Sequence, residues 1–269
     1  MLGDLSWVDV ATYSQEMPLV VLPVGAVEQH GPHLPLLVDS IVVEALAAEG
    51  SRRTGVVVAP TVLYSSSQGH SSLYPGTLAL TPRTTQSVLE DLGRWLTSAG
   101  FCKVFILNGH LGNNGVLWNA VDELVASLSP TVSICGRSWW DLSPALWDEV
   151  TSDASDARAQ FHANWAETAL MLHLRPDLVR MDRAVDQAEH PWEFAYDMSR
   201  KSPSGSIGGG VTRATADEGR RLFDHAATAL AQVIAAMIDE QPPPAPPADV
   251  KAWRLAAAQR FAGGAEEGP

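Results

Sequence analysis

The sequence predicts an α/β layered fold with a mainly parallel sheet, and two observations carry that prediction. First, three short runs are continuously apolar and rich in β-branched residues, as in strands that are buried on both faces. They span residues 19–25, 56–60 and 103–107. Second, segments with apolar residues at helical spacing separate these runs, and strands that alternate with helices favour a parallel sheet.

The helices and the remaining strand have local signals of their own. Residues 40–53 follow the first strand in a helical pattern that Gly55 would end. Thr81 and Pro82 would open the next helix, because a capping residue is followed by proline at the first helical position. Apolar residues at helical spacing continue this helix to about Leu96. Further helices are predicted at about 115–128, 164–174 and 216–240, and residues 131–135 are a weaker candidate for a fourth strand.

The segments between and beyond these elements differ in composition. Residues 139–158 are aromatic, acidic and irregular, which indicates a long loop with short helical pieces. Residues 185–214 contain four glycines in an irregular stretch and are expected to form a mobile loop. Residues 241–269 are rich in proline, alanine and glycine and are expected to stay flexible. We therefore predict a single domain over residues 1–240, followed by a tail.

Composition excludes some classes of protein. With 269 residues, of which 46% are hydrophobic, the chain can bury a substantial core. Its formal charge is −13 and its Lys and Arg residues form no cluster, so nucleic acid is not an expected partner. The N-terminus lacks the pattern of a signal peptide, and no apolar run is expected to reach the ~20 residues that cross a bilayer. We expect a cytoplasmic protein with no membrane partner, in which Cys102 and Cys135 are reduced core residues.

Acidic and histidine side chains follow the first predicted strand. Glu28 and His30 are two residues apart, so in an extended segment both side chains point to the same side. Asp39 follows at the start of a helix. Ligands of open α/β sheets bind outside the carboxyl ends of the strands, so the three side chains are candidate ligands. Taken one by one, Glu28 also fits a solvated loop carboxylate and Asp39 a helix cap.

Two further segments carry similar residues. His110 lies in NGHLGNN directly after the strand 103–107, where glycines let the backbone turn sharply and a neutral imidazole can bind metal. The alternative is a turn with an incidental surface histidine. Glu167 lies on an apolar helix, where a carboxylate without a partner would be costly to bury, and His162 precedes that helix. Glu167 also fits a first-turn glutamate favoured by the helix dipole, and spacing alone does not make it a chelating pair with His162.

In these three segments the chain resembles the creatininase family of metal-dependent amidohydrolases. The resemblance rests on PVGAVEQHGPHLPLLVD, NGHLGNN and HANWAETALML, in that order, and extends along nearly the whole chain. It implies a three-layer α/β sandwich in which helices flank the sheet, and assembly as a homohexamer. It also implies two divalent metal ions per chain, zinc, manganese or iron, bridged by Asp39. The implied metal ligands are Glu28, His30, Asp39, His110 and Glu167, and His162 is the implied catalytic residue that transfers a proton.

The activity that the resemblance implies is hydrolysis of a C–N amide-type bond in a small molecule by a metal-activated water. The alternative within the family is a peptidase that trims a short modified peptide such as the mycofactocin precursor. A non-catalytic oligomer stabilised by metal is a third hypothesis, although a closed structural metal site has no use for a free His162. Creatininase has an acidic ligand where this chain has Gly112, which argues against creatinine as the substrate.

Three further residues are candidates for substrate binding. His70 matches a region that lines the pocket in this family, although it also fits a loop-capping histidine. Trp139 and Trp140 could form an aromatic wall over a small substrate, but aromatic residues in a long loop are just as often core or interface residues. His33 is expected to be structural, or to support the metal ligands, despite its closeness to His30.

Overall fold

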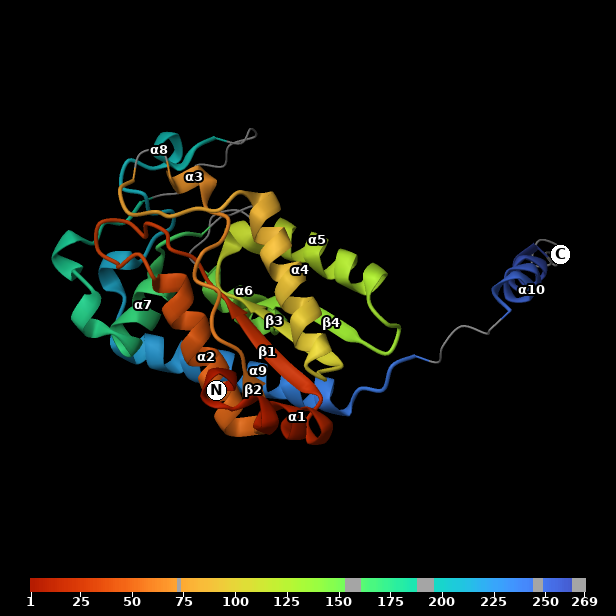
Figure 1. The fold of residues 1–269 in the computed structure, drawn as a ribbon. Helices are drawn as coiled ribbons and strands as arrows, with labels where there is room; N and C mark the ends of the chain where they lie inside the picture. The colour runs from red at the N-terminus through yellow and green to blue at the C-terminus, as the bar shows by residue number, and fades with distance from the viewer. Residues whose placement is uncertain (72–73, 153–160, 188–195, 244–248, 263–269) are drawn as a thin grey trace, which may run out of the picture.

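Four parallel strands form the centre of the described part of the chain, which in the computed structural model comprises residues 1–71, 74–152, 161–187, 196–243 and 249–262 (Figure 1). The strands are β1 (Leu19–Val24), β2 (Val57–Val58), β3 (Lys103–Asn108) and β4 (Ser133–Ser138). Their order in the sheet is β2-β1-β3-β4, and every pairing is parallel. The predicted α/β fold with a parallel sheet is confirmed.

Helices and short 3₁₀ turns connect and flank these strands. The α-helices of the described residues are α1 (Trp7–Glu16), α2 (Val38–Thr54), α3 (Gln68–Ser71), α4 (Pro82–Ser98), α5 (Asn114–Ser127), α6 (Pro144–Val150), α7 (Trp165–Leu174), α8 (Met198–Lys201), α9 (Ala216–Asp239) and α10 (Val250–Ala262). The 3₁₀ helices are Leu2–Asp4, Leu111–Asn113, Trp139–Asp141, Pro176–Leu178, Met181–Arg183 and Val211–Arg213. The helices that periodicity predicts are all found, with their ends displaced by less than one turn.

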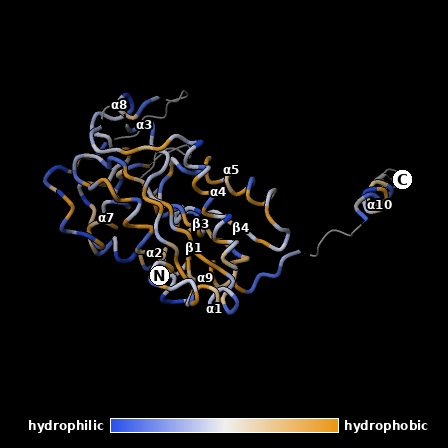
Figure 2. The backbone as a smooth tube through the Cα atoms, in the orientation of Figure 1, coloured by the Kyte–Doolittle hydropathy of each residue, from blue (hydrophilic) through white to orange (hydrophobic). Residues whose placement is uncertain are grey.

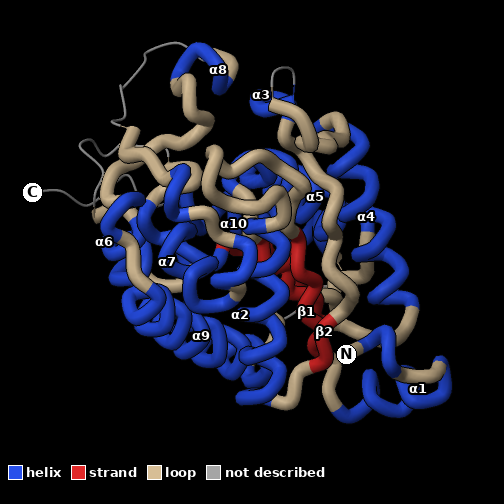
Figure 3. Tube along the Cα trace, turned by 90° about the vertical axis from the view of Figure 1, so that its left-hand side faces the viewer, coloured by secondary structure: helices blue, strands red, loops and turns tan. Residues whose placement is uncertain are grey.

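The helices cover both faces of the sheet and make a three-layer sandwich (Figure 3). On one face α2, α7 and α9 pack over Leu19 and Val21 of β1. On the other face α4 and α5 pack over Val20 and Leu22. Neighbouring residues of a strand point to opposite faces, so β1 supplies both cores. The hydrophobic residues that Figure 2 shows along β1 and β3 are therefore continuous in sequence and do not alternate.

Capping interactions fix several helix ends. The side chain of Thr81 accepts a hydrogen bond from the N–H of Thr84 at 3.2 Å at the start of α4. Gly55 ends α2 with φ of +77°, in the left-handed region that glycine adopts most easily. Helix α1 was not predicted, although Ser6 and Asp9 form a capping box. The Ser-x-x-Asp spacing is the local signal that marks the start of α1.

Helix α9 corrects the expectation that no apolar run is long enough to cross a bilayer. Among the described residues it is the one helix that meets the test of length and hydropathy for a membrane span. One face of this helix, however, packs inside the domain against α2 and α7. Leu222, Leu230 and Ile234 are fully buried there. The hydropathy of α9 is therefore explained by its packing as a core helix.

The irregular segments contain more structure than their composition predicts. The segment 139–158 holds a 3₁₀ turn and α6, and its end lies outside the described residues. In the segment 185–214, of which residues 188–195 are not described, Ser206 and Ile207 are buried. In the tail, α10 extends away from the sheet (Figure 1). Mobility of the loop and of the tail stays a prediction.

The register of the sheet sets the place of the functional residues. Val24 at the end of β1 pairs with Asn108 at the end of β3. The N–H of Gly109 donates to the carbonyl of Val24 at 2.8 Å, so the chain leaves both strands at the same edge. The two loops that carry the first and second sequence motifs therefore begin side by side.

Candidate metal centre

The loop after β1 is fixed against the start of α2. The N–H of Glu28 donates to the carbonyl of Leu36 at 2.9 Å, and the hydroxyl of Ser40 donates to the carbonyl of Ala26 at 2.9 Å. A side chain on Gly25 would collide with Ser40. The absence of a Cβ at this position therefore lets α2 approach the end of β1. This approach brings the first turn of α2, with Asp39, next to the residues of the loop.

The turn after β3 is held by the side chain of Asn108. Its Oδ1 accepts from the N–H of His110 at 3.1 Å, and its Nδ2 donates to the carbonyl of His110 at 2.8 Å. A Cβ on Gly109 would collide with the backbone carbonyl of Asp39. The Asn-Gly-His sequence thus folds back on itself and presents the His110 ring to Asp39.

Helix α7 supplies the third segment. Asn164 caps it by accepting from the N–H groups of Ala166 and Glu167. One oxygen of Glu167 accepts from the N–H of Ala163 at 2.6 Å, and the other lies 4.0 Å from Nε2 of His30. The prediction of a first-turn glutamate and the prediction of a metal ligand are therefore compatible, since each uses a different oxygen.

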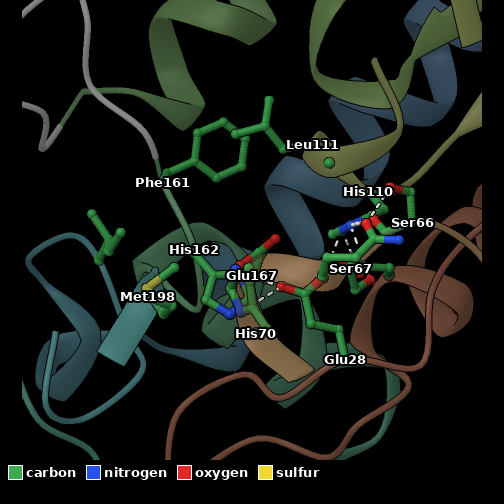
Figure 4. A pocket seen from close by; sticks show the side chains of 15 residues that line it. Glu28, Ser66, Ser67, His70, His110, Leu111, Phe161, His162, Glu167 and Met198 are labelled. Carbon is green, nitrogen blue, oxygen red and sulfur yellow. Dashed lines mark hydrogen bonds and ion pairs between the residues drawn. The ribbon is translucent and has the colours of Figure 1, made fainter. Parts of the chain in front are cut away.

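The five predicted ligands come together in two adjoining groups, all of them buried. In the first group, Nδ1 of His110 lies 3.0 Å from Oε2 of Glu28 and 3.1 Å from Oδ2 of Asp39. In the second, Nε2 of His30 lies 3.2 Å from Oδ1 of Asp39 and next to Glu167. Asp39 thus presents one oxygen to each group. Figure 4 shows Glu28, His110 and Glu167 around the same pocket.

The charges in this cluster depend on one another. Burial alone would lower the pKa of His30, but the Asp39 and Glu167 carboxylates raise it to about 10. Burial would raise the pKa of Asp39, but His30 and His110 lower it to about 2. Burial raises the pKa of Glu167 to about 7. Against burial, Glu28 and Asp39 hold the pKa of His110 well above its usual range. Without metal, protonated histidines therefore neutralise the buried carboxylates.

The donor set fits divalent cations. Among the described residues, both carboxylate oxygens of Glu28 and Oδ2 of Asp39 are buried without a hydrogen-bond partner. Nδ1 of His110 lies within ion-pair distance of Glu28 and of Asp39. Several carboxylate oxygens and imidazole nitrogens thus converge on one buried volume, as the ligand atoms of a cation do. Imidazole nitrogen with carboxylate oxygen is a set that suits zinc and other first-row metals.

His162 lies beside both groups and its ring is held from behind. Its backbone forms a β-bridge with Ile207. Its Nε2 lies 2.7 Å from the carbonyl oxygen of Gln29 and 3.1 Å from the amide nitrogen of Gln29. The shorter contact is to an oxygen that can only accept, so we assign the hydrogen to Nε2. Nδ1, which faces Glu28 at 3.7 Å from Oε1, is left without a hydrogen. Burial, with help from His30, holds the pKa of His162 well below its usual range. The ring is therefore neutral and presents an unprotonated nitrogen to the centre.

The centre opens into a cavity of about 320 Å³. The described residues that line it are Glu28, Asp39, Ser66, Ser67, Gln68, Gly69, His70, His110, Leu111, Gly112, Phe161, His162, Glu167, Met198 and Ile207. His70, a predicted substrate-binding residue, is among them. Figure 4 shows Leu111 and Phe161 across the cavity from Glu28, so one wall is apolar and the other is charged.

The two predicted tryptophans lie elsewhere. Trp139 and Trp140 are 1% and 2% exposed within the hydrophobic core, and neither is among the described residues that line the cavity. Trp140 packs edge-on against Phe161 with ring centroids 5.4 Å apart, and Phe161 reaches the cavity. The expectation that they contact substrate directly is therefore corrected. The physical reason is that a large indole gains more from full burial in the hydrophobic core than from partial exposure at the cavity.

Some residues of the site were not predicted from sequence. Gln29 lies between two ligands, and its amide nitrogen contacts His70 at 2.9 Å and the carbonyl of Gly205 at 3.0 Å. Its place within the first motif was the available signal. Met198 and Ile207 reach the cavity from the segment expected to be a loop, and no local pattern marks them.

His33 and Gly112 have structural settings of their own. The hydroxyl of Thr168 donates to the carbonyl of Asn164 and so accepts from Nε2 of His33 at 2.9 Å, which ties the first motif to α7. This contact agrees with the expected supporting role. At Gly112 a Cβ would collide with the ring of His110. In this arrangement the position has no room for a side chain, so the acidic ligand expected there from the resemblance to creatininase has no counterpart.

Comparison with known proteins places the chain among amidohydrolases. Residues 3–234 match the creatininase family, described as creatinine amidohydrolase. Creatinine amidohydrolase of Pseudomonas putida is 28% identical over 257 residues, which cover 90% of this chain and 97% of that protein. The mycofactocin precursor peptide peptidase of Mycolicibacterium smegmatis is 34% identical over 220 residues, covering 77% of this chain and 80% of that protein.

Solved structures agree with this assignment. A crystal structure of creatinine amidohydrolase superimposes with a TM-score of 0.78 and 26% identity, covering 89% of this chain and 98% of that one. Two further structures have titles that name a Zn-Zn type creatininase mutant and creatininase with Mn. Each has a TM-score of 0.77 and 26% identity, and covers 88% of this chain and 98% of that one.

Proposed function

The chain belongs to the creatininase family of amidohydrolases, and from this premise we propose that it is a dinuclear metal-dependent enzyme that cleaves the C–N bond of a small amide. The observation that carries the proposal is the position of Asp39, whose two oxygens face different groups of buried ligands. A carboxylate placed in this way can bridge two cations. Five converging ligands also exceed the four that one tetrahedral ion uses.

The ligand assignment follows the two groups. One ion is assigned to Glu28, Asp39 and His110, and the other to His30, Asp39 and Glu167. Zinc, manganese and iron are the proposed metals, and the family's Zn and Mn structures support the first two. His162 also lies close enough to His30 and Glu167 to act as a ligand. We assign it to proton transfer, because its Nδ1 can serve the reaction only while it is not bound to metal.

Bound at this centre, two divalent ions supply a polarised amide carbonyl and a water of lowered pKa. The protein contributes the proton path. Gln29 fixes the tautomer of His162 through the hydrogen bond from Nε2, so the bare Nδ1 can accept a proton from the attacking water. The same nitrogen can then deliver the proton to the departing amine nitrogen. Burial keeps His162 neutral and ready to accept.

A second candidate function is trimming of a short modified peptide. The mycobacterial peptidases support it, since the one from Mycolicibacterium smegmatis is 34% identical to this chain. The apolar wall of Leu111, Phe161 and Met198 also suits an apolar side chain beside the scissile bond. A peptide bond and a small amide need the same hydrolytic chemistry. The shape of the cavity wall and mouth would therefore decide which of the two substrate classes the enzyme accepts.

Assembly and location are further proposals that rest on the family resemblance. We propose a homohexamer, since symmetric self-association is common among enzymes. The exposed Trp118 of α5, at 66% exposure, offers apolar contact area for such an assembly. We propose a cytoplasmic location, which is consistent with the two free thiols of Cys102 and Cys135. Light scattering that finds a monomer at micromolar concentration would contradict the hexamer.

The proposed function is tested by metal loading combined with a substrate panel. Protein freed of metal and reloaded with zinc or manganese should hold two ions per chain and hydrolyse at least one compound. The panel comprises creatinine, other small cyclic and linear amides, and short peptides with apolar C-terminal residues. Fewer than two ions, or no turnover with any member, contradicts the proposal. Turnover of peptides alone favours the second candidate.

A further inference from the structure

We propose that the centre has a third cation position, formed by Glu28, His70 and His162, and that excess metal inhibits the enzyme by filling it. The inference rests on the proposed function for the first two positions. One ligand atom from each of the three residues lies within 4.8 Å of the others. The ligand assignment above leaves His70, His162 and one oxygen of Glu28 unused.

The geometry repeats the one that joins the first two positions. Oε2 of Glu28 faces His110 at 3.0 Å, while Oε1 faces Nδ1 of His70 at 2.6 Å and Nδ1 of His162 at 3.7 Å. Glu28 therefore presents one oxygen to each of two ligand groups, as Asp39 does. Two shared carboxylates would link three cation positions in a row. The third position also offers two imidazole nitrogens, from His70 and His162, and imidazole is a ligand that suits first-row metals.

The ligand atoms of both histidines converge on Oε1 of Glu28. Among the described residues, Oε1 of Glu28 has no hydrogen-bond partner although His70 is at ion-pair distance. His162 cannot turn its other nitrogen to the centre, because Nε2 donates to the carbonyl of Gln29. The amide nitrogen of Gln29 lies 2.9 Å from the same Nδ1 of His70 that faces Glu28, so it orients this nitrogen toward the centre and would give up the contact to a cation. Both rings are thus oriented toward Glu28 before any cation arrives.

Access and charge predict that this position fills last. The His70 side chain is 15% exposed, whereas those of His30 and Asp39 are 1% and 3% exposed, so the third position lies nearest the solvent. Three carboxylates balance most of the charge of two divalent ions. A third ion would meet the repulsion of the other two with only a shared carboxylate to offset it. Its affinity should therefore be much weaker than theirs.

Filling this position has a direct consequence for turnover. A cation on Nδ1 of His162 takes the lone pair that accepts the proton of the attacking water. The loaded enzyme should then lose activity as the third ion binds, although the first two ions stay in place. Inhibition by excess metal should accordingly follow the occupancy of this one position.

The test is a metal titration of zinc-loaded protein with both binding and activity as readouts. Isothermal titration and elemental analysis after gel filtration should reveal a third, weaker equivalent of Zn²⁺, and activity should fall at least tenfold over the same range. Co²⁺ in place of Zn²⁺ gives an independent readout, since its visible absorption should change again after two equivalents.

The His70→Ala variant tests the assignment. It should keep two equivalents, lose the third and resist inhibition relative to its own basal rate. His173→Ala is the matched control, since His173 packs against Phe223 away from the centre, and it should behave as the unmodified chain does. Saturation at two equivalents without inhibition, or a third equivalent and inhibition unchanged in His70→Ala, overturns the inference. Saturation below two equivalents contradicts the proposed function instead.

Discussion

The two ends of the sheet carry cavities of similar size and opposite character. The cavity at the amino ends of β1, β3 and β4 measures about 350 Å³, and the metal centre opens into one of about 320 Å³. At the amino ends, Nζ of Lys103 donates to the carbonyls of Met237, Ile238 and Glu240 at 2.7–2.8 Å and thereby caps the end of α9. At the carboxyl ends, Glu28 is buried with neither oxygen hydrogen-bonded among the described residues.

This difference shows what distinguishes a functional site from a structural one in this fold. Volume alone does not separate the two cavities. Burying several carboxylates and histidines together is costly even when their charges balance, and the cost persists only where the cluster serves another purpose. At the amino ends of the strands, Lys103 and the last carbonyls of α9 satisfy each other's hydrogen bonds. We therefore expect this end of the sheet to contribute to stability alone. The following predictions test the contrast, from the largest expected effect to the smallest.

Removing the charge of Asp39 should have the largest effect. Asp39→Asn keeps the shape of the side chain but weakens its hold on both ions at once, so metal content and activity should fall together to the level of metal-free protein. Elemental analysis and a rate assay on the same sample measure this. Asp177→Asn makes the same change at an exposed ion pair with Arg175 and should change neither. An Asp39→Asn protein that holds two ions would remove Asp39 as the bridge.

Removing His162 should separate binding from turnover. We expect His162→Ala to keep both ions while kcat falls by roughly 10²–10⁴-fold, the contribution typical of a general acid or base. Metal analysis alongside steady-state kinetics decides between the roles. Loss of metal comparable to that of Asp39→Asn would make His162 a ligand, and full activity would make it a bystander.

Metal binding should release protons and strengthen with pH. The pKa of His30 is about 10 in the metal-free cluster, so at pH 7 this ring is protonated and must lose its proton to bind metal. The apparent affinity should therefore rise about tenfold per pH unit for each proton released. Titration calorimetry in buffers of different ionisation enthalpy counts the protons. Binding without proton release at pH 7 would contradict the charge state assigned to the cluster.

The stability of the metal-free protein should change with pH in the opposite direction. The pKa values of His30 and His110 are raised by folding, so their contribution is fully present below the unfolded value near 6.5 and is lost as pH rises. Between pH 7 and 9 the free energy of unfolding should fall for metal-free protein more than for loaded protein. Urea unfolding of both forms measures it. Equal slopes would show that these histidines are neutral without metal.

The smallest effect is expected at the other end of the sheet. Lys103→Met removes the donor that caps α9 and should lower the free energy of unfolding by about 1–2 kcal/mol. Metal content and kcat should stay unchanged. Urea unfolding and the rate assay test both parts. A loss of activity without a loss of stability would mean that the two ends of the sheet are coupled.

Local signals predicted most of the fold. Strands buried on both faces are continuously apolar, so β1 and β3 could be read directly, and Thr81 with Pro82 marked the start of α4. The short strand β2 and the edge strand β4 were harder, because β4 is largely half-buried and its apolar pattern is weak. The packing of residues 196–214 over the site depends on contacts distant in sequence, which no local pattern encodes.

The sequence also predicted the ligands of the candidate site, but not the contacts that orient them. The five proposed ligands follow strands or start helices, where the register of a parallel sheet brings them together. The tautomer of His162 was not predictable, since it depends on the backbone carbonyl of Gln29, which is 133 residues away in sequence. The position of Trp140 was missed for a related reason, because its packing against Phe161 follows from the tertiary structure.

The most direct test of the account is anomalous diffraction from crystals of protein loaded with two equivalents of zinc or manganese. The account predicts two peaks on either side of Asp39, one bound by Glu28 and His110 and the other by His30 and Glu167. A single peak would contradict it. So would two peaks that leave the Asp39 carboxylate unbound, for example with one ion held by Glu28, His70 and His162 before the position of His30 is filled.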